Sequence, residues 1–462
     1  MMVLARLLNP KDFGLVAMVT ALTSVLDLFR DFGLSSAAIH NKNVTEDQSS
    51  TLFWINTAVG LFLSLLLTAL APLVVVIYHE PQLFWVTIVL ASGFLINAAG
   101  IQHSVLLERQ MRFTALAWIS LVCLVTSTTV GIVMAYRGCG YWALIGMTIT
   151  NPATYTVAVW LTSRWIPGTP KRKVGMHSMM RFGGTITLNG IVVYVSYNLE
   201  KVLLGRFWGP EAVGIYGRAY QLVNVPTDNL NSAIGGVAFR ALCEVRDEPG
   251  RLRRYFLKGY SLILGLTIPV TITSAVFANE VILVVLGPKW KDTVTIFRFL
   301  APTILVFAII NPLGWLMMAL GHVGKSLKIA CVLSPLVIIG YSVGLRYGPK
   351  GVAIGYSSVL LIWVVPHIMW CVQGTPISLK DILLTAIRPL ASGIAAAAAA
   401  LVVEAFSQSL FPLFRLGLGI LVLLTTYFLM LLYVMKQKPF YWDILQGLKQ
   451  RSFMKEKALT SV

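Results

Sequence analysis

The ten residues Arg6–Leu15 have the sequence RLLNPKDFGL, and the ten residues Arg206–Ile215 have the sequence RFWGPEAVGI. At this spacing of 200 residues, an arginine, a proline and a glycine recur at the same places, and an aliphatic residue ends both stretches. Each stretch forms a short loop before a long apolar run. A second, weaker match relates Gly140–Leu144 (GYWAL) to Gly351–Ile354 (GVAI). Two matches in the same order predict an internal duplication of the chain.

Long apolar runs separated by short polar loops extend outward from these stretches. Of the 462 residues, 57% are hydrophobic and 12% are charged, whereas a soluble protein has roughly 25% charged residues. About 20 apolar residues in a helix span a hydrocarbon core of ~30 Å. The predicted runs are 14–39, 51–77, 83–106, 114–136, 141–163, 177–204, 213–240, 257–284, 293–320, 326–346, 351–372, 382–406 and 415–435. The sequence therefore predicts an all-α polytopic membrane protein and excludes soluble enzymes, nucleic-acid-binding proteins and secreted disulfide scaffolds.

The duplication groups these runs into two parallel pseudo-repeats of six helices, followed by two additional C-terminal helices. Parallel repeats about an axis along the membrane normal are typical of alternating-access carriers. The predicted parts are an N-terminal half (1–163), a C-terminal half (177–372), the two additional transmembrane helices (380–436) and a tail (437–462).

The helix before Arg206 has only the stub Met1–Leu8 as its counterpart, so the parent architecture would have fourteen helices with the first one truncated here. We therefore expect that the native gene starts upstream of Met1.

Basic residues concentrate on alternate loops. The formal net charge is +18, from 37 Lys and Arg against 19 Asp and Glu. The more basic set of loops includes Arg109 and Arg112, the segment 164–173, the segment 240–258, and the tail. Because loops rich in Lys and Arg stay on the cytoplasmic side, these loops and the C-terminus are predicted to be cytoplasmic.

Motifs for metals, disulfides and nucleotides are not found in the sequence. The five cysteines form no CxxC pair, the six histidines are scattered, and no GxxxxGK[ST] motif occurs. We therefore expect no metal site, no cofactor, no disulfide framework and no ATP hydrolysis by this chain.

Three ionisable residues share one face of the first apolar run. Asp27, Arg30 and Asp31 are spaced i, i+3 and i+4, and ionisable groups within membrane helices are costly and usually functional or paired. The functional hypothesis is a cavity cation, Arg30, held by the two carboxylates. The alternative is a self-satisfied cluster near the cytoplasmic end, where Arg30 extends to the headgroups.

A second charged group surrounds the loop at Gly209. Glu200 and Arg218 each lie nine positions from Gly209, so they are predicted to face each other across the turn at similar depth as an ion pair. Lys201 then has no obvious partner and is a candidate cavity cation.

Asp228 is the ionisable residue nearest the middle of the run 213–240. It follows Pro226 and is flanked by Asn224 and Asn231; Pro226 frees a backbone carbonyl. This group is a candidate site for a coupling proton or sodium ion, and the alternative is a hydrogen-bonded polar group at a kink.

Other basic residues have simpler interpretations. Arg181, Arg298 and Arg388 lie near helix ends and are expected to extend to the lipid headgroups. The loop 246–254 is interpreted as a topology signal that also contacts anionic lipid.

Several stretches resemble a known family. They are Leu4–Gly14 (LARLLNPKDFG), Asp31–Ser35 (DFGLS), Leu107–Phe113 (LERQMRF), Arg181–Gly183 (RFG), Asn198–Phe207 (NLEKVLLGRF) and Gly214–Tyr220 (GIYGRAY). From about residue 3 to 372 the chain resembles the Wzx polysaccharide flippases of the colanic-acid-exporter type. These belong to the multidrug/oligosaccharidyl-lipid/polysaccharide (MOP) exporter superfamily.

The resemblance implies a non-enzymatic exporter of lipopolysaccharide or exopolysaccharide units in the bacterial plasma (inner) membrane. The cargo would be a polyprenyl-pyrophosphate-linked oligosaccharide moved by alternating access, with a polysaccharide polymerase and co-polymerase as partners. Arg30, Lys201 and Arg218 would bind the pyrophosphate in one cavity, because arginine binds phosphate oxygens bidentately. Asp27, Asp31 and Glu200 would be the supporting carboxylates.

Two alternatives stay open. A multidrug exporter of the same superfamily would carry organic cations, although cations within the helices favour an anionic cargo. A polysaccharide polymerase or ligase would need an extramembrane platform, and the short outward loops argue against one.

Overall fold

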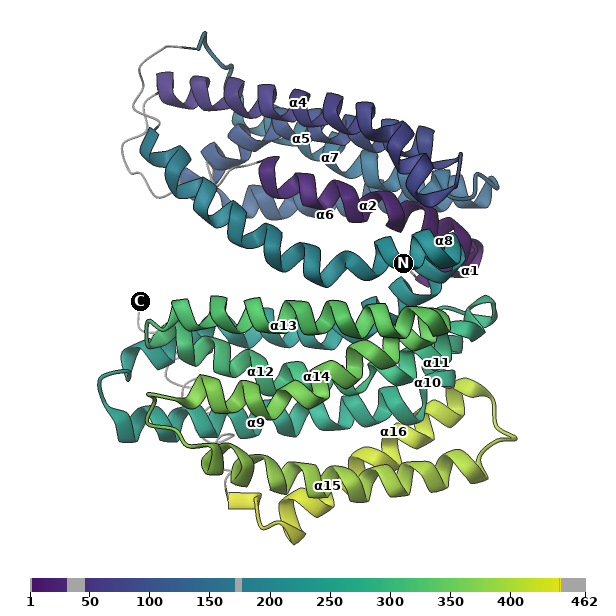
Figure 1. Ribbon diagram of the computed structural model, residues 1–462, viewed down its shortest axis with the longest axis vertical. Coiled ribbons are helices and arrows are strands. Elements are labelled where there is room, and N and C mark those ends of the chain that lie inside the picture. The colour runs from purple at the N-terminus through teal and green to yellow at the C-terminus, as the bar shows by residue number, and fades with distance from the viewer. Residues whose placement is uncertain (1, 31–45, 171–176, 440, 442–462) are drawn as a thin grey trace, which may run out of the picture. The chain divides into compact units, whose positions relative to one another are not determined.

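The computed structural model describes residues 2–30, 46–170, 177–439 and 441, and of these it leaves the side chains of 28–30, 177–197 and 323 undescribed. The helices are α1 (Met2–Leu7), α2 (Pro10–Arg30), α4 (Glu46–Tyr78), α5 (Leu83–Arg109), α6 (Phe113–Tyr136), α7 (Trp142–Ser163), α8 (His177–Glu244), α9 (Pro249–Val276), α10 (Ala278–Val285), α11 (Lys291–Leu300), α12 (Pro302–Ala319), α13 (Val323–Gly344), α14 (Gly348–Val372), α15 (Leu379–Phe406) and α16 (Pro412–Leu429). Short helical turns are η1 (Pro288–Trp290), η2 (Leu345–Tyr347) and η3 (Met430–Val434), the last of which is a π-helix. Every regular element in these described ranges is helical (Figure 1), which confirms the predicted all-α class.

Eight helical segments of the described chain are long and apolar enough to cross a membrane, with 324–372 counted as one segment. Their outer faces carry exposed apolar side chains, such as Leu61, Phe62 and Leu65 on α4 and Leu124 on α6. Such rows of exposed large hydrophobic groups are stable in lipid and not in water. The chain is therefore a multi-pass membrane protein.

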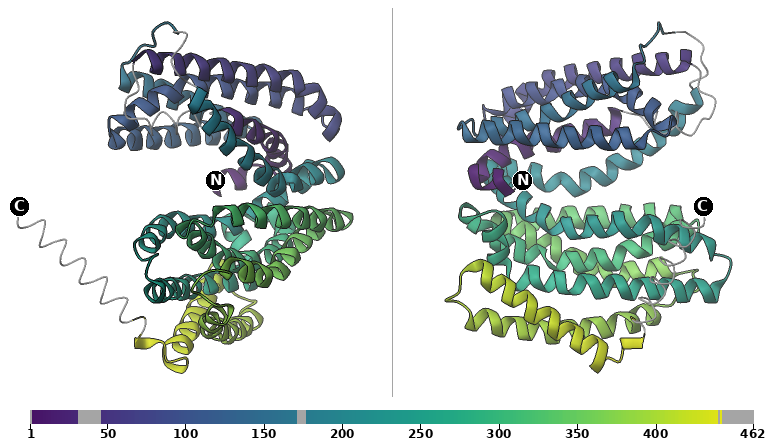
Figure 2. Two further views of the ribbon diagram at one scale, coloured as in Figure 1. Left: turned by 60° about the vertical axis from the view of Figure 1, so that its left-hand side comes forward. Right: turned by 180° about the vertical axis from the view of Figure 1, so that it is seen from behind.

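The helices form two compact units. The first contains residues 1–218 and 334–355, and the second contains 219–333 and 356–462. In the first unit α4 packs along α5, α6 packs along α7, and α2 packs against α4, α5 and α7 (Figure 2). The boundaries of these units differ from those of the predicted sequence halves, which remain a prediction about the repeat.

A single glycine divides α8 into two limbs, 177–208 and 210–244. Gly209 has φ 78° and ψ −179°, while helical geometry continues on both sides of it. This conformation is open to glycine and is strained for residues with a Cβ. The expected loop between 204 and 213 is therefore reduced to one residue.

The two stretches that define the duplication contact each other reciprocally within the first unit. A Cβ on Gly14 would lie 1.6 Å from the carbonyl oxygen of Pro210, and a Cβ on Gly214 would lie 1.9 Å from that of Pro10. The proline and glycine of one stretch thus face the glycine and proline of the other. Only residues without side-chain bulk allow α2 and the second limb of α8 to approach this closely.

In the second unit α9 packs against both α12 and α15, and α15 packs against α16.

Two of the predicted apolar runs in the second unit are each divided into two helices. The run 257–284 is split between α9 and α10 at Phe277, and the run 293–320 is split between α11 and α12 at Ala301. Pro302 starts α12, a position where its missing N–H costs no helical hydrogen bond.

A network of charges attaches α16 to the rest of the second unit. Arg415 Nη1 lies 2.9 Å from Glu280 Oε1, and Arg415 Nη2 donates to the backbone oxygen of Glu404 at 3.0 Å. Arg298 donates from Nε to the carbonyl oxygen of Ala275 at 3.1 Å. The Arg298 side chain is 49% exposed, so the expectation that it extends to the headgroups remains a prediction.

Candidate functional site

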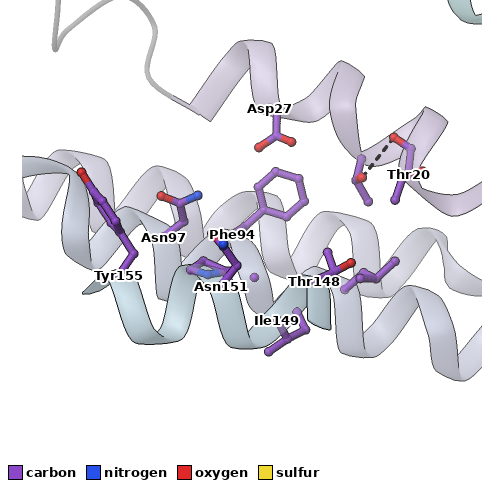
Figure 3. A pocket seen from close by; sticks show the side chains of 12 residues that line it. Thr20, Asp27, Phe94, Asn97, Thr148, Ile149, Asn151 and Tyr155 are labelled. Atoms are coloured by element: carbon purple, nitrogen blue, oxygen red, sulfur yellow. Dashed lines mark hydrogen bonds between the residues drawn. The ribbon is translucent and has the colours of Figure 1, made fainter. Parts of the chain in front are cut away.

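A polar cavity of about 370 Å³ lies in the first unit between α2, α5 and α7 (Figure 3). Its described lining is Thr20, Thr23 and Asp27 from α2, Leu90, Gly93, Phe94 and Asn97 from α5, and Thr148, Ile149, Asn151, Pro152 and Tyr155 from α7. This volume is within the range of small-molecule sites in proteins. The cavity therefore has room for a small hydrated ion.

Asp27 is the one charged side chain in the described lining of this cavity. Its carboxylate points from α2 toward α5 and α7, where Asn97, Asn151 and Tyr155 present polar groups (Figure 3). A carboxylate that shares a cavity lining with neutral amide and hydroxyl groups is a typical environment for a proton or a hard cation. We call the cavity with this lining the Asp27 cavity.

The threonines of α2 are oriented by their own helix. Thr23 Oγ1 donates to the carbonyl oxygen of Thr20 at 3.2 Å, and Thr20 Oγ1 donates to that of Ala17 at 3.2 Å. A hydroxyl that donates its proton to the backbone keeps its lone pairs for another ligand. Both side chains can therefore accept from, or coordinate, a cavity ligand.

A proline interrupts the backbone ladder of α7 at the cavity wall. Pro152 lacks an N–H, so the carbonyl oxygen of Thr148, four residues earlier, loses its helical donor. Next to it, Asn151 Nδ2 lies 3.5 Å from Ser127 Oγ on α6. α7 thus has, beside the cavity, one carbonyl oxygen without its usual helical donor.

The outcome for the predicted cluster on the first run is partial. Asp27 lines the cavity, whereas the side chain of Arg30 and all of Asp31 lie outside the described residues. The roles of Arg30 as a cavity cation and of Asp31 as its support remain predictions.

The predicted ion pair between Glu200 and Arg218 is not formed, which corrects the sequence interpretation. Glu200 is 1% exposed, and neither of its carboxylate oxygens has a hydrogen-bond partner among the described residues. The Arg218 guanidinium lies 4.0 Å from the centroid of the Phe13 ring. Equal separation from Gly209 places the two residues at a similar depth, but it does not set the direction in which their side chains point. Nine residues at 3.6 per turn correspond to two and a half turns of helix, and not to a whole number of turns.

Lys201 has a partner that the sequence interpretation did not assign. Its Nζ donates to Asn198 Oδ1 at 2.7 Å within the same limb of α8. Neither Lys201 nor Arg218 belongs to the lining of the Asp27 cavity. A cationic site that combines them with Arg30 therefore remains a prediction.

The second limb of α8 carries Asn224, Asp228 and Asn231. Asp228 and Asn231 are exposed, and Asn224 is half-buried. Asn231 lines a small cavity of about 20 Å³ in the second unit, together with Thr227 and residues of α9 and α12. Asp228 and Asn224 are not part of that lining. The coupling-ion role of the three residues remains a prediction.

Sequence reasoning missed the polar residues that complete the Asp27 cavity. Asn97 and Asn151 are amides within the apolar runs 83–106 and 141–163, and Pro152 follows Asn151 directly. Polar residues inside a predicted membrane helix, next to a proline, are the signal that could have identified them.

Comparisons with known proteins agree with this fold. Residues 3–295 match the model of a family described as polysaccharide biosynthesis protein. The lipopolysaccharide biosynthesis protein WzxC of Escherichia coli (strain K12) is 27% identical over 373 residues, which cover 78% of this chain and 74% of that protein.

Two solved structures share the fold at low sequence identity. The lipid II flippase MurJ, in an inward closed conformation, matches with a TM-score of 0.74 and 14% identity over 96% of both chains. A multidrug resistance MATE family transporter of the MOP superfamily, in an inward-facing conformation, matches with a TM-score of 0.61 and 14% identity, over 80% of this chain and 92% of the other. The predicted resemblance to Wzx-type proteins is thereby confirmed, and the likeness to the MurJ and MATE structures confirms the predicted fold.

Proposed function

This chain belongs to the family of polysaccharide biosynthesis proteins, and from that premise we propose that it exports a lipid-linked oligosaccharide across the membrane. The cargo is a polyprenyl-pyrophosphate-linked glycan, and alternating access moves it from one leaflet to the other. The observation that carries this proposal is the match to MurJ, a lipid II flippase, over 96% of both chains. A multi-pass helical fold with internal duplication supports the transport class.

The Asp27 cavity supplies the coupling step in this proposal. Its carboxylate binds a proton or a cation in one conformation and releases it in the other, which gives the two conformations different affinities for the ion. Asn97, Asn151 and the free carbonyl of Thr148 complete the oxygen ligands. The predicted cations Arg30, Lys201 and Arg218 bind the pyrophosphate.

In this proposal the chain lies in the bacterial plasma membrane, and the positive-inside rule supports an orientation with a cytoplasmic C-terminus. The segment 240–258 and residues Lys436 and Lys438 then lie on the cytoplasmic side. The glycolipid is taken up from that leaflet.

The proposal is tested in proteoliposomes that contain the full chain and a fluorescent polyprenyl-pyrophosphate oligosaccharide. Translocation is followed as the fraction of fluorophore that an impermeant reductant outside the vesicles can quench. We expect this fraction to rise with wild-type protein and to stay at the protein-free level with Asp27→Asn.

Two further variants assign the coupling residue. Asp247→Asn removes a carboxylate that is 90% exposed and is expected to leave translocation unchanged. Asp228→Asn tests the rival ion site. Loss of translocation in this variant, with normal translocation in Asp27→Asn, would move the coupling role to Asp228.

The alternative functions predict other results. Accumulation of an organic cation without glycolipid movement would favour the multidrug exporter, and formation of longer glycan chains would favour a polymerase.

A further inference from the structure

A second large pocket, remote in sequence from the Asp27 cavity, lies in the second unit where α9 and α15 begin. It has a volume of about 890 Å³ and includes residues that follow η3. Five cations line it: Arg253, Arg254, Lys258, Arg388 and Lys436. We call it the basic pocket.

One carboxylate, Asp381, is in the described lining of the basic pocket, and it is fully engaged. Arg253 binds it bidentately, with Nη2 to Oδ1 at 2.5 Å and Nε to Oδ2 at 2.8 Å. Asp381 Oδ2 also accepts from the backbone N–H of Ser378 at 3.0 Å, as part of the N-terminal cap of α15. The acid is therefore a structural support for Arg253 and does not neutralise the remaining cations.

Three of the other four cations keep their charge available. In the described part of the chain, no ion pair joins Arg254, Arg388 or Lys436 to a carboxylate. These three cations are positive charges of the pocket that no described carboxylate balances. Like charges gathered in this way repel one another unless an anion lies between them.

The pocket is also open to an apolar surface. Leu257 and Leu384 belong to its lining, and Leu384 is 55% exposed on the outer face of α15. An anion with a hydrocarbon chain can place its charge among the cations and its chain along α15. A soluble anion has no hydrocarbon chain, so this apolar wall would not contribute to its binding.

We propose that the basic pocket binds the headgroup of a lipid that carries two phosphate groups. Basic pockets between membrane helices near the membrane surface bind such headgroups. A phosphodiester has one negative charge, so two phosphates match these three cations better than one. The arginine forks of Arg254 and Arg388 bind phosphate oxygens bidentately. The site requires only that these helix ends lie at the membrane surface. A phospholipid there would be independent of the proposed transport, whereas a polyprenyl pyrophosphate there rests on the proposed cargo.

Two lipids have this chemistry: a phospholipid with two phosphodiesters, and a polyprenyl pyrophosphate. The test measures lipid binding to the purified full chain in detergent by native mass spectrometry. The probes are cardiolipin, undecaprenyl pyrophosphate, phosphatidylglycerol and inorganic pyrophosphate. We expect one of the first two to bind at least tenfold more tightly than phosphatidylglycerol, and which of them binds identifies the source.

The decisive comparison uses two double variants with equal loss of charge. Arg254→Gln/Arg388→Gln removes two pocket cations, whereas Arg246→Gln/Arg251→Gln removes two exposed cations of the same region that do not line the pocket. The pocket variant is expected to weaken binding about 30-fold and the control variant less than threefold. Equal losses in both variants, equal affinity for phosphatidylglycerol, or equally tight binding of inorganic pyrophosphate would overturn the proposal.

Discussion

At the scale of single residues, the close approach of α2 and α8 depends on two glycines. Gly14 and Gly214 each face a proline carbonyl of the other repeat stretch. The sequence predicted the repeat from the recurring proline and glycine, but it did not predict that the two copies touch. A spacing in sequence shows which residues correspond, and only the packed helices show that they meet.

We predict that Gly14→Ala strongly destabilises the protein. The added Cβ would lie 1.6 Å from the oxygen of Pro210, and relief of such overpacking costs about 1–3 kcal/mol. Thermal unfolding in detergent, followed by size-exclusion chromatography, measures the loss. Gly217→Ala is the control, because nothing lies within 4 Å of its added Cβ and alanine is favoured over glycine in a helix. Equal melting temperatures for the two variants would contradict the role of close packing.

At the scale of helices, most predicted runs correspond to observed elements, because a membrane-spanning helix must be continuously apolar. The breaks at Phe277 and Ala301 were missed because each falls inside a run that is apolar on average, although Asn279 and Glu280 closely follow the first break. Pro302 was the local signal for the second break. Of the polar residues in the Asp27 cavity, the sequence analysis identified Asp27, because a charged residue stands out in an apolar run. It missed the amides of α5 and α7, because uncharged polar residues lower the hydropathy of a run only slightly.

The contribution of Pro152 to transport can be separated from its effect on the stability of the protein. We predict that Pro152→Ala raises the melting temperature and lowers transport, because the new N–H takes the free carbonyl of Thr148 into the helix ladder. Pro366→Ala in α14 is the control, since Pro366 lies inside a helix but does not line the Asp27 cavity. A transport loss of the same size in the control would show a general effect of helix stiffness.

The ion pair between Arg415 and Glu280 fastens α16 to α10. Glu280 is 1% exposed at its side chain and Arg415 is 14% exposed. We predict that Arg415→Met destabilises the protein by about 3–5 kcal/mol, because it leaves a buried carboxylate without its partner. The double variant Glu280→Gln/Arg415→Met removes both charges and is expected to recover most of this stability. Thermal unfolding in detergent measures both variants, and a double variant no more stable than the single one would refute the explanation.

At the scale of the whole molecule, the predicted duplication relates two cavities with different charge. Position 27 and position 227 are separated by the repeat spacing of 200 residues, and both line a cavity in their own unit. The first carries a carboxylate and the second a threonine. Each cavity also has an asparagine from the neighbouring part of its unit, Asn97 or Asn311. The volumes are about 370 and 20 Å³ respectively.

This asymmetry predicts the result of moving the carboxylate from one repeat to the other. In a strain that lacks its own exporter, Asp27→Asn is expected to abolish surface polysaccharide, and Asp27→Asn/Thr227→Asp is expected not to restore it. A cavity of about 20 Å³ is about the size for one water molecule, so a carboxylate placed there cannot bind a hydrated cation and is costly to bury. Membrane abundance must be measured for each variant, and Thr227→Ser controls for change at that position. If the double variant exports as much polysaccharide as wild type, the two cavities are interchangeable and the coupling role belongs to the repeat rather than to the first unit.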